Sequence, residues 1–337
     1  MEIKSNFSLK NYNTFGIDAK AKEFVAVHSV ADLKEVLEEN SAKEKFVLGG
    51  GSNMLLTKNV DALVIHIDLK GKKVVKEDED FVWVEGQAGE NWHEFVLWNI
   101  ENNFGGLENM SLIPGNVGTT PVQNIGAYGA EIKDTFVSCD AMHIATREMK
   151  TFYREECSFG YRESIFKQEI KDQYIITSVV FKLTKRNHKI NISYGDITKE
   201  LEKNNINEPT IKDVSNAVIA IRRSKLPDPK ELGNSGSFFK NPVITKEHFD
   251  QIHPQFPEMK YYVVSPTEVK VPAGWLIEQA GFKGMRIGDA GVHKNQALVL
   301  VNYGNATGQE IVNLSKEIQK TIFEKYTIAI EAEVNII

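Results

Sequence analysis

The sequence predicts a protein of mixed helices and strands divided into two domains. Its 337 residues are about two domains' worth of globular chain, and 42% of them are hydrophobic, enough to form cores. Segments with the period of an amphipathic helix occur among short apolar segments typical of strands. Pro227 and Pro229 must end a helical segment, because proline restricts itself and the residue before it. We expect the second domain to begin there.

The first part of the chain has regular patterns as far as residue 100. A helix is expected over 30–40, where Ser29 and Asp32 resemble a capping box before an apolar stripe. A buried strand is expected at 46–48, running into the three glycines at 49–51. The other elements expected here are strands at 62–67 and 81–84, a solvated connection at 72–80 and a helix over 92–100.

Residues 102–129 have no helical or strand period. Glycines, asparagines and threonines are interleaved with apolar residues, which argue against disorder. So long an irregular segment in a compact domain is usually functional. We therefore expect an ordered backbone wrapped closely around a ligand, the alternative being an unusually long structural loop.

Periodic segments return after this region. The expected strands are at 136–144 and 174–183, and the expected helices are at 211–221, 273–280 and 307–326. Thr210 and Thr307 begin capping boxes, and Gly281 closes the middle helix. The chain ends in an expected strand at 327–337, whose apolar residues alternate with a face that carries Glu331 and Glu333.

Composition excludes several classes of function. Forty basic residues against 46 acidic ones give a net charge of −6, a poor basis for general nucleic-acid or anionic-membrane binding. No apolar segment approaches membrane-spanning length, and the polar residues 1–16 contain no signal core. Cys139 and Cys157 are too few for a disulfide framework or a zinc site. We expect a reduced, cytoplasmic chain without a metal.

Two glycine-rich segments suggest phosphate binding. The strand that leads into Gly49 can bring backbone N–H groups close to a phosphate, although a tight turn is an equal alternative. The dinucleotide fingerprint GxGxxG fails because Met54 occupies its last position, so a Rossmann fold is disfavoured. Residues 114–129 offer backbone donors, hydroxyls and amides, which suit a large polar ligand with a heteroaromatic ring.

Single reactive residues have ordinary interpretations when each is taken alone. Ser237 precedes Lys240 in an S-x-x-K pattern, but the pattern recurs at Ser164 and its partner motifs are missing. Arg162 can bind a carboxylate, yet an isolated arginine is more often a surface residue. Arg222 can bind phosphate or simply complement a helix dipole. The sequence around Tyr194 is most simply a turn.

Short motifs occur in a fixed order along nearly the whole chain. They are Asn13-Thr14-Phe15-Gly16, the turn at 49–53, Leu112 to Gly129, Tyr161-Arg162-Glu163-Ser164, Gly236 to Pro242, Ala273 to Ile277 and Gln296 to Leu300. Each motif alone has low specificity, whereas the ordered set is highly specific. From about residue 11 to the C-terminal strand, the chain resembles the UDP-N-acetylenolpyruvoylglucosamine reductase (MurB) family of flavoenzymes.

The resemblance implies an α+β fold. A two-lobed FAD-binding domain of the vanillyl-alcohol-oxidase (PCMH) type would span 1–200, with lobes of about 1–70 and 71–200. A linker helix and a smaller α+β substrate-binding domain would follow over 201–326, and the final strand at 327–337 would carry a catalytic glutamate.

The resemblance also implies a bacterial cytoplasmic enzyme of peptidoglycan precursor synthesis. Such an enzyme holds FAD non-covalently and takes hydride from NADPH. It reduces UDP-N-acetylenolpyruvoylglucosamine to UDP-N-acetylmuramate, with hydride added to the enolpyruvyl C3 and a proton to C2.

Family motifs carry over to individual residues of this sequence. Arg162 matches the arginine that binds the substrate carboxylate, Ser237 the proton donor, and Glu333 the acid that stabilises or protonates the intermediate. The implied FAD-binding positions are Gly49, Gly50, Gly51, Ser52, Asn53, Thr119, Thr120, Pro121, Gln123, Asn124, Gly126, Ala127, Gly129 and Arg222. The implied substrate-binding positions are Tyr161, Tyr194, Lys225, Asn241 and Gln296.

The chain departs from the family pattern at its C-terminal end. Asn335 stands where the family commonly has arginine, and Ala332 where it commonly has proline. The chain stops at Ile337, where longer relatives continue. None of these departures removes a reactive position.

Two other functions are compatible with parts of the sequence. Another FAD-dependent oxidoreductase on the same scaffold would share the glycine loops, but it would not need Arg162, Ser237 and Glu333 together with Lys225. A non-catalytic flavin- or nucleotide-binding protein would not need the reactive positions that are intact here. We expect a monomer, since no exposed apolar helix stripe is evident.

Overall fold

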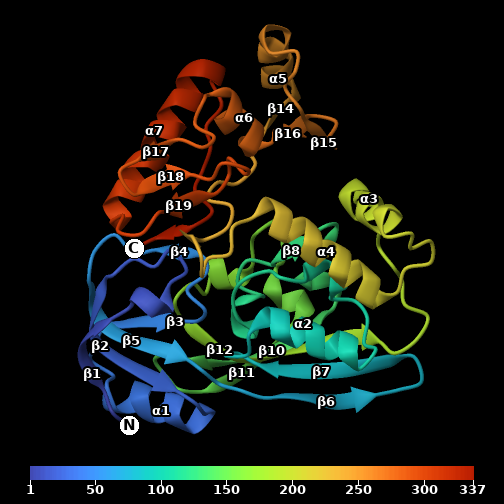
Figure 1. The fold of residues 1–337 in the computed structure, drawn as a ribbon. Coiled ribbons are helices and arrows are strands. Elements are labelled where there is room, and N and C mark those ends of the chain that lie inside the picture. The colour runs from blue at the N-terminus through green and yellow to red at the C-terminus, as the bar shows by residue number, and fades with distance from the viewer. The chain divides into compact units, whose positions relative to one another are not determined.

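Two structural units, each made of several stretches of chain, account for all 337 residues of the computed structural model (Figure 1). Unit 1 comprises residues 1–7, 21–50 and 60–224, and unit 2 comprises residues 8–20, 51–59 and 225–337. The chain therefore leaves unit 1 at the triple glycine and returns to it at residue 60.

The first sheet of unit 1 has four strands in the order β1-β2-β5-β3. They are β1 (Lys4–Ser8), β2 (Lys20–Val27), β3 (Lys45–Leu48) and β5 (Val60–Ile67), and β5 runs parallel to both β2 and β3. Helix α1 (Val30–Glu39) confirms the expected helix and packs its apolar face on β2 and β5. Because β3 is an edge strand, Val47 is exposed, so the expectation of a buried strand at 46–48 is wrong in that respect.

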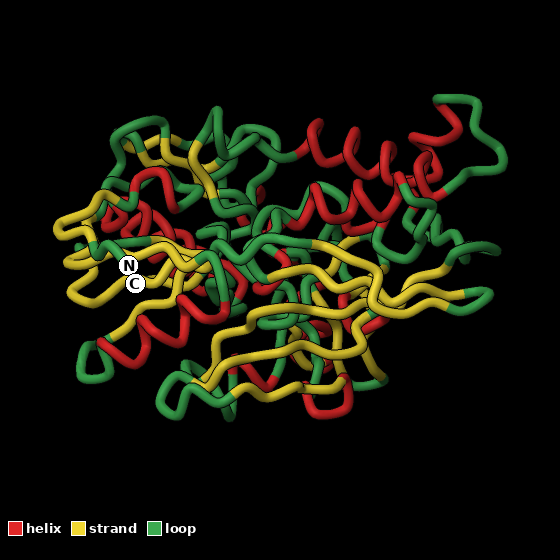
Figure 2. The backbone as a smooth tube through the Cα atoms, turned by 90° about the horizontal axis from the view of Figure 1, so that it is seen from below, coloured by secondary structure: helices red, strands yellow, loops and turns green.

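The second sheet of unit 1 is antiparallel, in the order β11-β10-β12-β7-β6. Figure 2 shows the strands of the molecule in yellow. Its strands are β6 (Lys72–Glu77), β7 (Phe81–Gln87), β10 (Phe136–His143), β11 (Met149–Tyr153) and β12 (Tyr174–Thr184). Helix α2 (Trp92–Glu101) buries Trp92, Phe95 and Val96 against it. These findings confirm the expected helix and three of the strands. The exposure expected at 72–80 is confirmed, but the expectation of a mere connection is wrong, because residues 72–77 form the edge strand β6 paired with β7.

The irregular segment at 102–129 is confirmed. It contains only the short turns Glu108–Met110 and Val117–Thr119 and the start of a hairpin, β8 (Gly126–Ala127) with β9 (Ala130–Glu131). Leu107, Met110 and Val117 are buried in the same core as α2, so the segment is ordered by packing.

Two helices complete unit 1. Helix α3 (Gly195–Lys203) was not expected from the sequence, and α4 (Ile211–Lys225) confirms and extends the helix expected at 211–221. Ile197 and Leu201 of α3 share a small core with Val214 and Val218 of α4. Helix α4 ends two residues before Pro227, as the proline rule requires.

Unit 2 is built on a sheet in the order β13-β19-β18-β17. These strands are β13 (Gly233–Asn234), β17 (Arg286–Ile287), β18 (Ala290–Val292) and β19 (Leu300–Asn302). Helices α6 (Ala273–Gln279) and α7 (Gly308–Tyr326) confirm the expected helices. The capping box of α7 is complete, since Thr307 Oγ1 accepts from Glu310 N at 3.2 Å and the Glu310 carboxylate accepts from Thr307 N at 2.7 Å.

A second sheet of unit 2 was not expected. It consists of β14 (Val243–Thr245), β15 (Tyr262–Ser265) and β16 (Glu268–Lys270), joined by α5 (Lys246–Ile252). Its strands are short and largely exposed, so they carry little of the apolar alternation that marks a buried strand in a sequence.

The strand expected at 327–337 is wrong in its extent. Only β20 (Asn335–Ile336) is a strand, paired in parallel with β4 (Met54–Leu55), and Ala332 makes an isolated bridge to Phe239. The alternation is confirmed only in part: Ile328, Ile330 and Val334 are buried and Glu331 is exposed, but Ile336, expected on the apolar face, is exposed.

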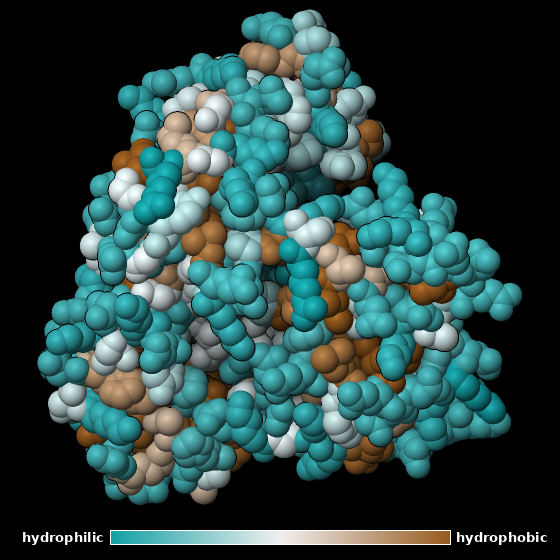
Figure 3. Space-filling view, viewed as in Figure 1, coloured by the Kyte–Doolittle hydropathy of each residue, from teal (hydrophilic) through white to brown (hydrophobic).

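The visible surface is mostly hydrophilic, with small separate hydrophobic patches (Figure 3). None of the helices is long and apolar enough to cross a membrane.

Candidate active site

Gly49 and Gly50 pack closely against the loop at 115–119 in unit 1, and we call these two packed loops the glycine cradle. A Cβ atom on Gly50 would lie 2.9 Å from Asn116 Oδ1 and 3.1 Å from Gly115 Cα, and one on Gly49 would lie 2.7 Å from Thr119 Cγ2. The turn after β3 and the loop at 115–119 therefore approach more closely than side chains would allow. Such glycine-lined surfaces present backbone N–H groups to anionic ligands.

Gly50→Ala should weaken FAD binding at this cradle by about tenfold. The added methyl overpacks the contact with Asn116 and Gly115, at a cost of about 1–3 kcal/mol. Titration of the apoprotein with FAD measures the effect. Gly195→Ala is the matched control, because a Cβ there meets nothing within 4 Å. Equal FAD affinity in the two variants would contradict the assignment of the cradle.

The loop at 115–118 is held by the segment that leads into α2. Trp92 N donates to Gly115 O at 3.0 Å, Val117 N to Glu90 O at 2.9 Å, and Gly118 N to Ala88 O at 3.0 Å. A β-like ladder thus fixes this part of the cradle without any side chain from the loop itself.

The following part of the loop is organised around Asn124. This residue is buried in the left-handed region at φ 43°, and its Nδ2 donates to Gly160 O at 2.9 Å and to Glu131 Oε2 at 3.1 Å. Its Oδ1 accepts from Lys133 N at 3.1 Å. The side chain of Asn124 is thus engaged within the protein, and it sets the path of the loop. Of the other predicted cofactor positions here, Thr120 and Pro121 are buried, Thr119 and Gly129 are exposed, and Gln123, Gly126 and Ala127 are half-buried.

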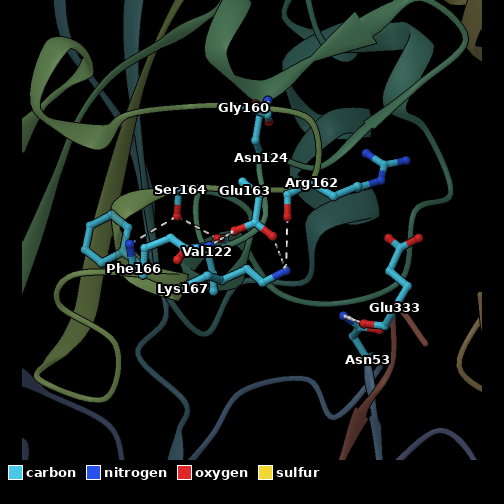
Figure 4. A network of polar contacts seen from close by, with 11 residues as sticks. Asn53, Val122, Asn124, Gly160, Arg162, Glu163, Ser164, Phe166, Lys167 and Glu333 are labelled. Carbon is cyan, nitrogen blue, oxygen red and sulfur yellow. Dashed lines mark hydrogen bonds and ion pairs between the residues drawn. The ribbon is translucent and has the colours of Figure 1, made fainter. Parts of the chain in front are cut away.

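Arg162 is held from both its side chain and its main chain, and Figure 4 shows the main-chain bond to Lys167. Its Nη2 donates to Gly126 O at 2.8 Å, and its carbonyl accepts from Lys167 Nζ at 3.0 Å. Ser164 Oγ donates to Val122 O at 2.6 Å, so Ser164 and Lys167, the second S-x-x-K pattern, are anchors of this turn. The backbone of Arg162 is left-handed, at φ 57°. This much restraint on one arginine is typical of a preorganised functional group.

Arg222 also lies in unit 1, and its surroundings would be stabilised by an anion. Burial lowers its pKa from the ordinary value, Tyr128 opposes this, and the charge of Arg162 lowers it further. Two arginines that repel each other in a partly dry environment are stabilised by a negatively charged ligand. Together with the glycine cradle, this donor set fits the diphosphate of FAD and the hydrogen-bond acceptors of its ring.

Tyr161 and Tyr194 are exposed aromatic residues near these groups. The Arg162 guanidinium lies 5.6 Å from the Tyr161 ring centre, and Tyr194 makes an edge-to-face contact with Tyr128 at 5.4 Å. Tyr194 is the N-cap of α3, so the turn expected around it is the first turn of a helix.

In unit 2, Ser237 and Glu333 lie on adjoining extended segments. Phe238 N donates to Leu298 O at 2.7 Å, Glu333 N to Phe238 O at 2.8 Å, and Lys240 N to Glu331 O at 2.9 Å. The segment that begins at Ser237 therefore runs between the one that follows Gln296 and the one that ends at Glu333. Phe238 is fully buried and fixes the segment, while Ser237 is exposed and Glu333 half-buried.

Two other predicted substrate-binding residues, Asn241 and Gln296, make hydrogen bonds to main-chain groups of unit 2. Asn241 Oδ1 accepts from Ala273 N at 2.9 Å, which ties it to the start of α6, and Gln296 Oε1 accepts from Leu298 N at 3.4 Å. Lys225 is the last residue of α4, at the boundary of the two units.

The second half of the glycine turn, residues 51–53, belongs to unit 2 and is bonded to the Glu333 segment (Figure 4). Asn53 Nδ2 donates to Glu333 O at 3.4 Å, while Asn335 N and Nδ2 donate to Asn53 O at 3.2 and 2.8 Å. A Cβ on Gly51 would lie 2.0 Å from Tyr12 O, and Ser52 is half-buried beside it. The side chain of Asn53, expected at the cofactor, thus holds the main chain of Glu333, expected to be catalytic, while Asn335 holds the main chain of Asn53.

Asn335→Ala should lower the free energy of unfolding by about 1 kcal/mol and also lower kcat. It removes the Nδ2 donor to Asn53 O and so loosens the main chain of Glu333. Urea unfolding and steady-state kinetics measure the two effects. Asn313→Ala, on the exposed face of α7, is the control. An unchanged kcat in Asn335→Ala would show that the Asn53 bond is not needed to place Glu333.

Relatives of known name match the chain from end to end. A UDP-N-acetylenolpyruvoylglucosamine reductase from Flavobacterium johnsoniae is 79% identical over 337 residues, covering 100% of both proteins. The chain belongs to the UDP-N-acetylenolpyruvoylglucosamine reductase family. A relative of the same name from Pseudomonas aeruginosa is 44% identical and covers 100% of this chain and 99% of its own. The model of the C-terminal domain of this reductase matches residues 228–337, and the FAD binding domain model matches residues 21–151.

Solved structures agree on the fold. The UDP-N-acetylenolpyruvylglucosamine reductase of Thermus caldophilus superposes with a TM-score of 0.68 at 24% identity, covering 99% of this chain and 98% of that one. A solvent-stable cholesterol oxidase superposes with a TM-score of 0.50 at 11% identity, covering 98% and 86%. The predicted α+β fold with an FAD-binding domain is confirmed.

Proposed function

We propose that this chain is an FAD-containing, NADPH-dependent oxidoreductase that reduces UDP-N-acetylenolpyruvoylglucosamine to UDP-N-acetylmuramate for peptidoglycan precursor synthesis in the bacterial cytoplasm. Full-length identity of 79% to a reductase of that name supports the activity. The structural observation that carries it is the bond from Glu333 N to Phe238 O, because it places the predicted proton donor Ser237 and the predicted acid Glu333 on adjoining segments.

Unit 1 supplies the cofactor side of the proposal. The glycine cradle at 49–50, the loop at 115–129 and Arg222 would hold FAD without a covalent bond. When bound there, FAD would supply the hydride chemistry that links NADPH to the enolpyruvyl C3 of the substrate.

Arg162 would bind the carboxylate of the enolpyruvyl group. Addition of hydride at C3 moves negative charge toward that carboxylate, and a guanidinium already in place lowers the barrier because it needs no reorganisation. The bonds to Gly126 O and from Lys167 Nζ keep the arginine in place before substrate arrives.

Ser237 would donate the proton to C2, and Glu333 would stabilise or protonate the same intermediate. A hydroxyl is a weak acid, so it needs a preorganised neighbourhood to act as a donor. Lys225 would meet a phosphate as a point charge, and Tyr161, Tyr194, Asn241 and Gln296 would contact the sugar nucleotide.

An anaerobic stopped-flow experiment at the flavin absorbance band tests the function. NADPH is added first and UDP-N-acetylenolpyruvoylglucosamine second. We expect bleaching followed by prompt recovery of the oxidised spectrum. Bleaching without recovery would favour another FAD-dependent oxidoreductase on the same scaffold. A flavin band that NADPH does not bleach would favour a flavin-binding protein without turnover.

A monomer is part of the proposal. Sedimentation velocity at micromolar protein should give a single species of about 38 kDa, the mass of one chain. A species of twice that mass would replace the monomer with a dimer and leave the chemistry untouched.

A further inference from the structure

Leu112 has a strained backbone in the middle of the cofactor loop. Its φ is 60°, in the left-handed region that residues with a Cβ rarely adopt. It precedes Ile113, Pro114 and Gly115, the last of which packs against Gly50. Such a conformation persists only where its surroundings hold it, so the contacts of Leu112 identify what the loop depends on.

Helices α2 and α4 hold Leu112 from two sides. His93 Nδ1, on the first turn of α2, accepts from Leu112 N at 3.0 Å. Arg222 Nε, on α4, donates to Leu112 O at 3.2 Å. Both polar groups of this one peptide residue are therefore taken by side chains, and one of these side chains is the predicted flavin contact.

The segments beside Leu112 are fixed by the same two helices. Trp92 Nε1 donates to Met110 O at 2.9 Å, and Trp92 N donates to Gly115 O. The hydroxyls of Ser111 and of Ser215, on α4, are 2.8 Å apart. These bonds fix the position of Leu112. The orientation of its N–H and C=O groups depends on His93 and Arg222.

We propose that His93 is a positioning residue that holds Leu112 in the left-handed conformation, so that the Leu112 carbonyl orients the Arg222 guanidinium toward the flavin. The inference rests on the proposed function only in taking Arg222 as a flavin contact. Without the acceptor at Nδ1, the strained peptide would relax and its carbonyl would turn away from Arg222.

The bond to Leu112 requires His93 to be unprotonated at Nδ1. Burial lowers the pKa of His93 below its ordinary value of 6.5, the charges of Arg223 and Arg222 on α4 lower it further, and only Glu94 on its own helix raises it. His93 is thus a neutral acceptor at neutral pH. When the bond to Leu112 is broken and His93 is exposed, the pKa of His93 returns toward 6.5. The bond therefore stabilises the loop fully above pH 6.5, and this stabilisation is lost as the pH falls below that value.

Four variants test the proposal by titration of apoprotein with FAD at pH 7.5. His93→Ala should raise the Kd of FAD about tenfold, because the half-buried Leu112 N–H loses its acceptor and the left-handed peptide is no longer held. His93→Asn places an oxygen near Nδ1 and should stay within about threefold of wild type. Leu112→Gly removes the strain of the left-handed backbone, so His93→Ala combined with Leu112→Gly should bind FAD as Leu112→Gly does. Additive losses in the double variant would overturn the proposal.

Two further readouts separate positioning from simple packing. The flavin midpoint potential of His93→Ala should shift in the same direction as that of Arg222→Gln, because both withdraw positive charge from the flavin. FAD affinity should fall below pH 6.5 in wild type and change less in His93→Asn. An unshifted potential, or equal pH profiles, would overturn the proposal. If His93→Ala does not fold, the comparison of wild type with His93→Asn decides the matter.

These outcomes are distinct from a failure of the proposed function. Wild-type protein that takes up no FAD would remove the function. Wild-type and His93→Ala proteins that bind FAD equally well would remove only the role of His93.

Discussion

Ser237→Ala should leave reduction of the flavin by NADPH as fast as in wild type, while reoxidation by UDP-N-acetylenolpyruvoylglucosamine slows by about 10²–10⁴-fold. That is the range contributed by a positioned proton donor. The substitution removes one oxygen from an exposed side chain, and Phe238 beside it stays buried, so the segment should keep its course. Single-turnover stopped-flow traces of the two half-reactions measure the effect.

Ser235→Ala is the control for this result. Ser235 lies two residues earlier and is buried, with its Oγ donating to Met54 O at 3.2 Å. Its loss should lower the free energy of unfolding by about 1 kcal/mol without a selective effect on reoxidation. Equal slowing of both half-reactions in Ser237→Ala would remove Ser237 from the protonation step.

Glu333→Gln should keep the yellow cofactor and slow reoxidation by about 10²–10³-fold. Glutamine has nearly the same size and keeps the main-chain bonds to Phe238 O and from Asn53 Nδ2, but it can neither deliver a proton nor change its charge. The FAD content after purification and the rate of the second half-reaction measure the two parts of the prediction.

Glu331→Gln is the matched control, because Glu331 is exposed two residues earlier on the same segment. The bond from Lys240 N reaches its main-chain oxygen and survives the substitution, so the rates should be those of wild type. Loss of FAD from Glu333→Gln alone would make Glu333 a structural residue. Equal slowing in both variants would mean that the charge of the segment matters rather than one acid.

Periodicity predicted the elements that bury an apolar face. Helices α1, α2, α6 and α7 have such faces, the first two and α7 also have side-chain N-caps, and each lies where its pattern predicted it. The pattern did not predict strand β6, because its residues are exposed and mostly charged. It is a strand only through its hydrogen bonds to β7. The strand predicted at 327–337 was wrong because its residues are buried in alternation but make few strand hydrogen bonds. Its alternation reflects burial beside residues 238–240, while its ladder is reduced to one bridge and two residues.

Family motifs supplied the candidate reactive side chains, but not the reasons for their placement. Nothing in the sequence distinguishes His93 from any other histidine on a helix, and its role depends on a main-chain N–H 19 residues away. The left-handed backbones of Leu112, Asn124 and Arg162 could not be predicted from the sequence either, since none of these residues is a glycine. The signal available was the density of glycine and asparagine around them, which indicated close backbone packing without saying where it occurs.

The path of the chain also constrains how such a protein can be divided or recombined. Residues 51–59 belong to unit 2 although residues on both sides of them belong to unit 1. A single cut anywhere between β4 and β20, such as one before Lys225, would leave β4 on one fragment and its partner β20 on the other. The interleaved units are therefore not independent modules. They have to be inherited, exchanged or engineered together. A graft of the C-terminal part onto another protein would have to include residues 51–59 as well.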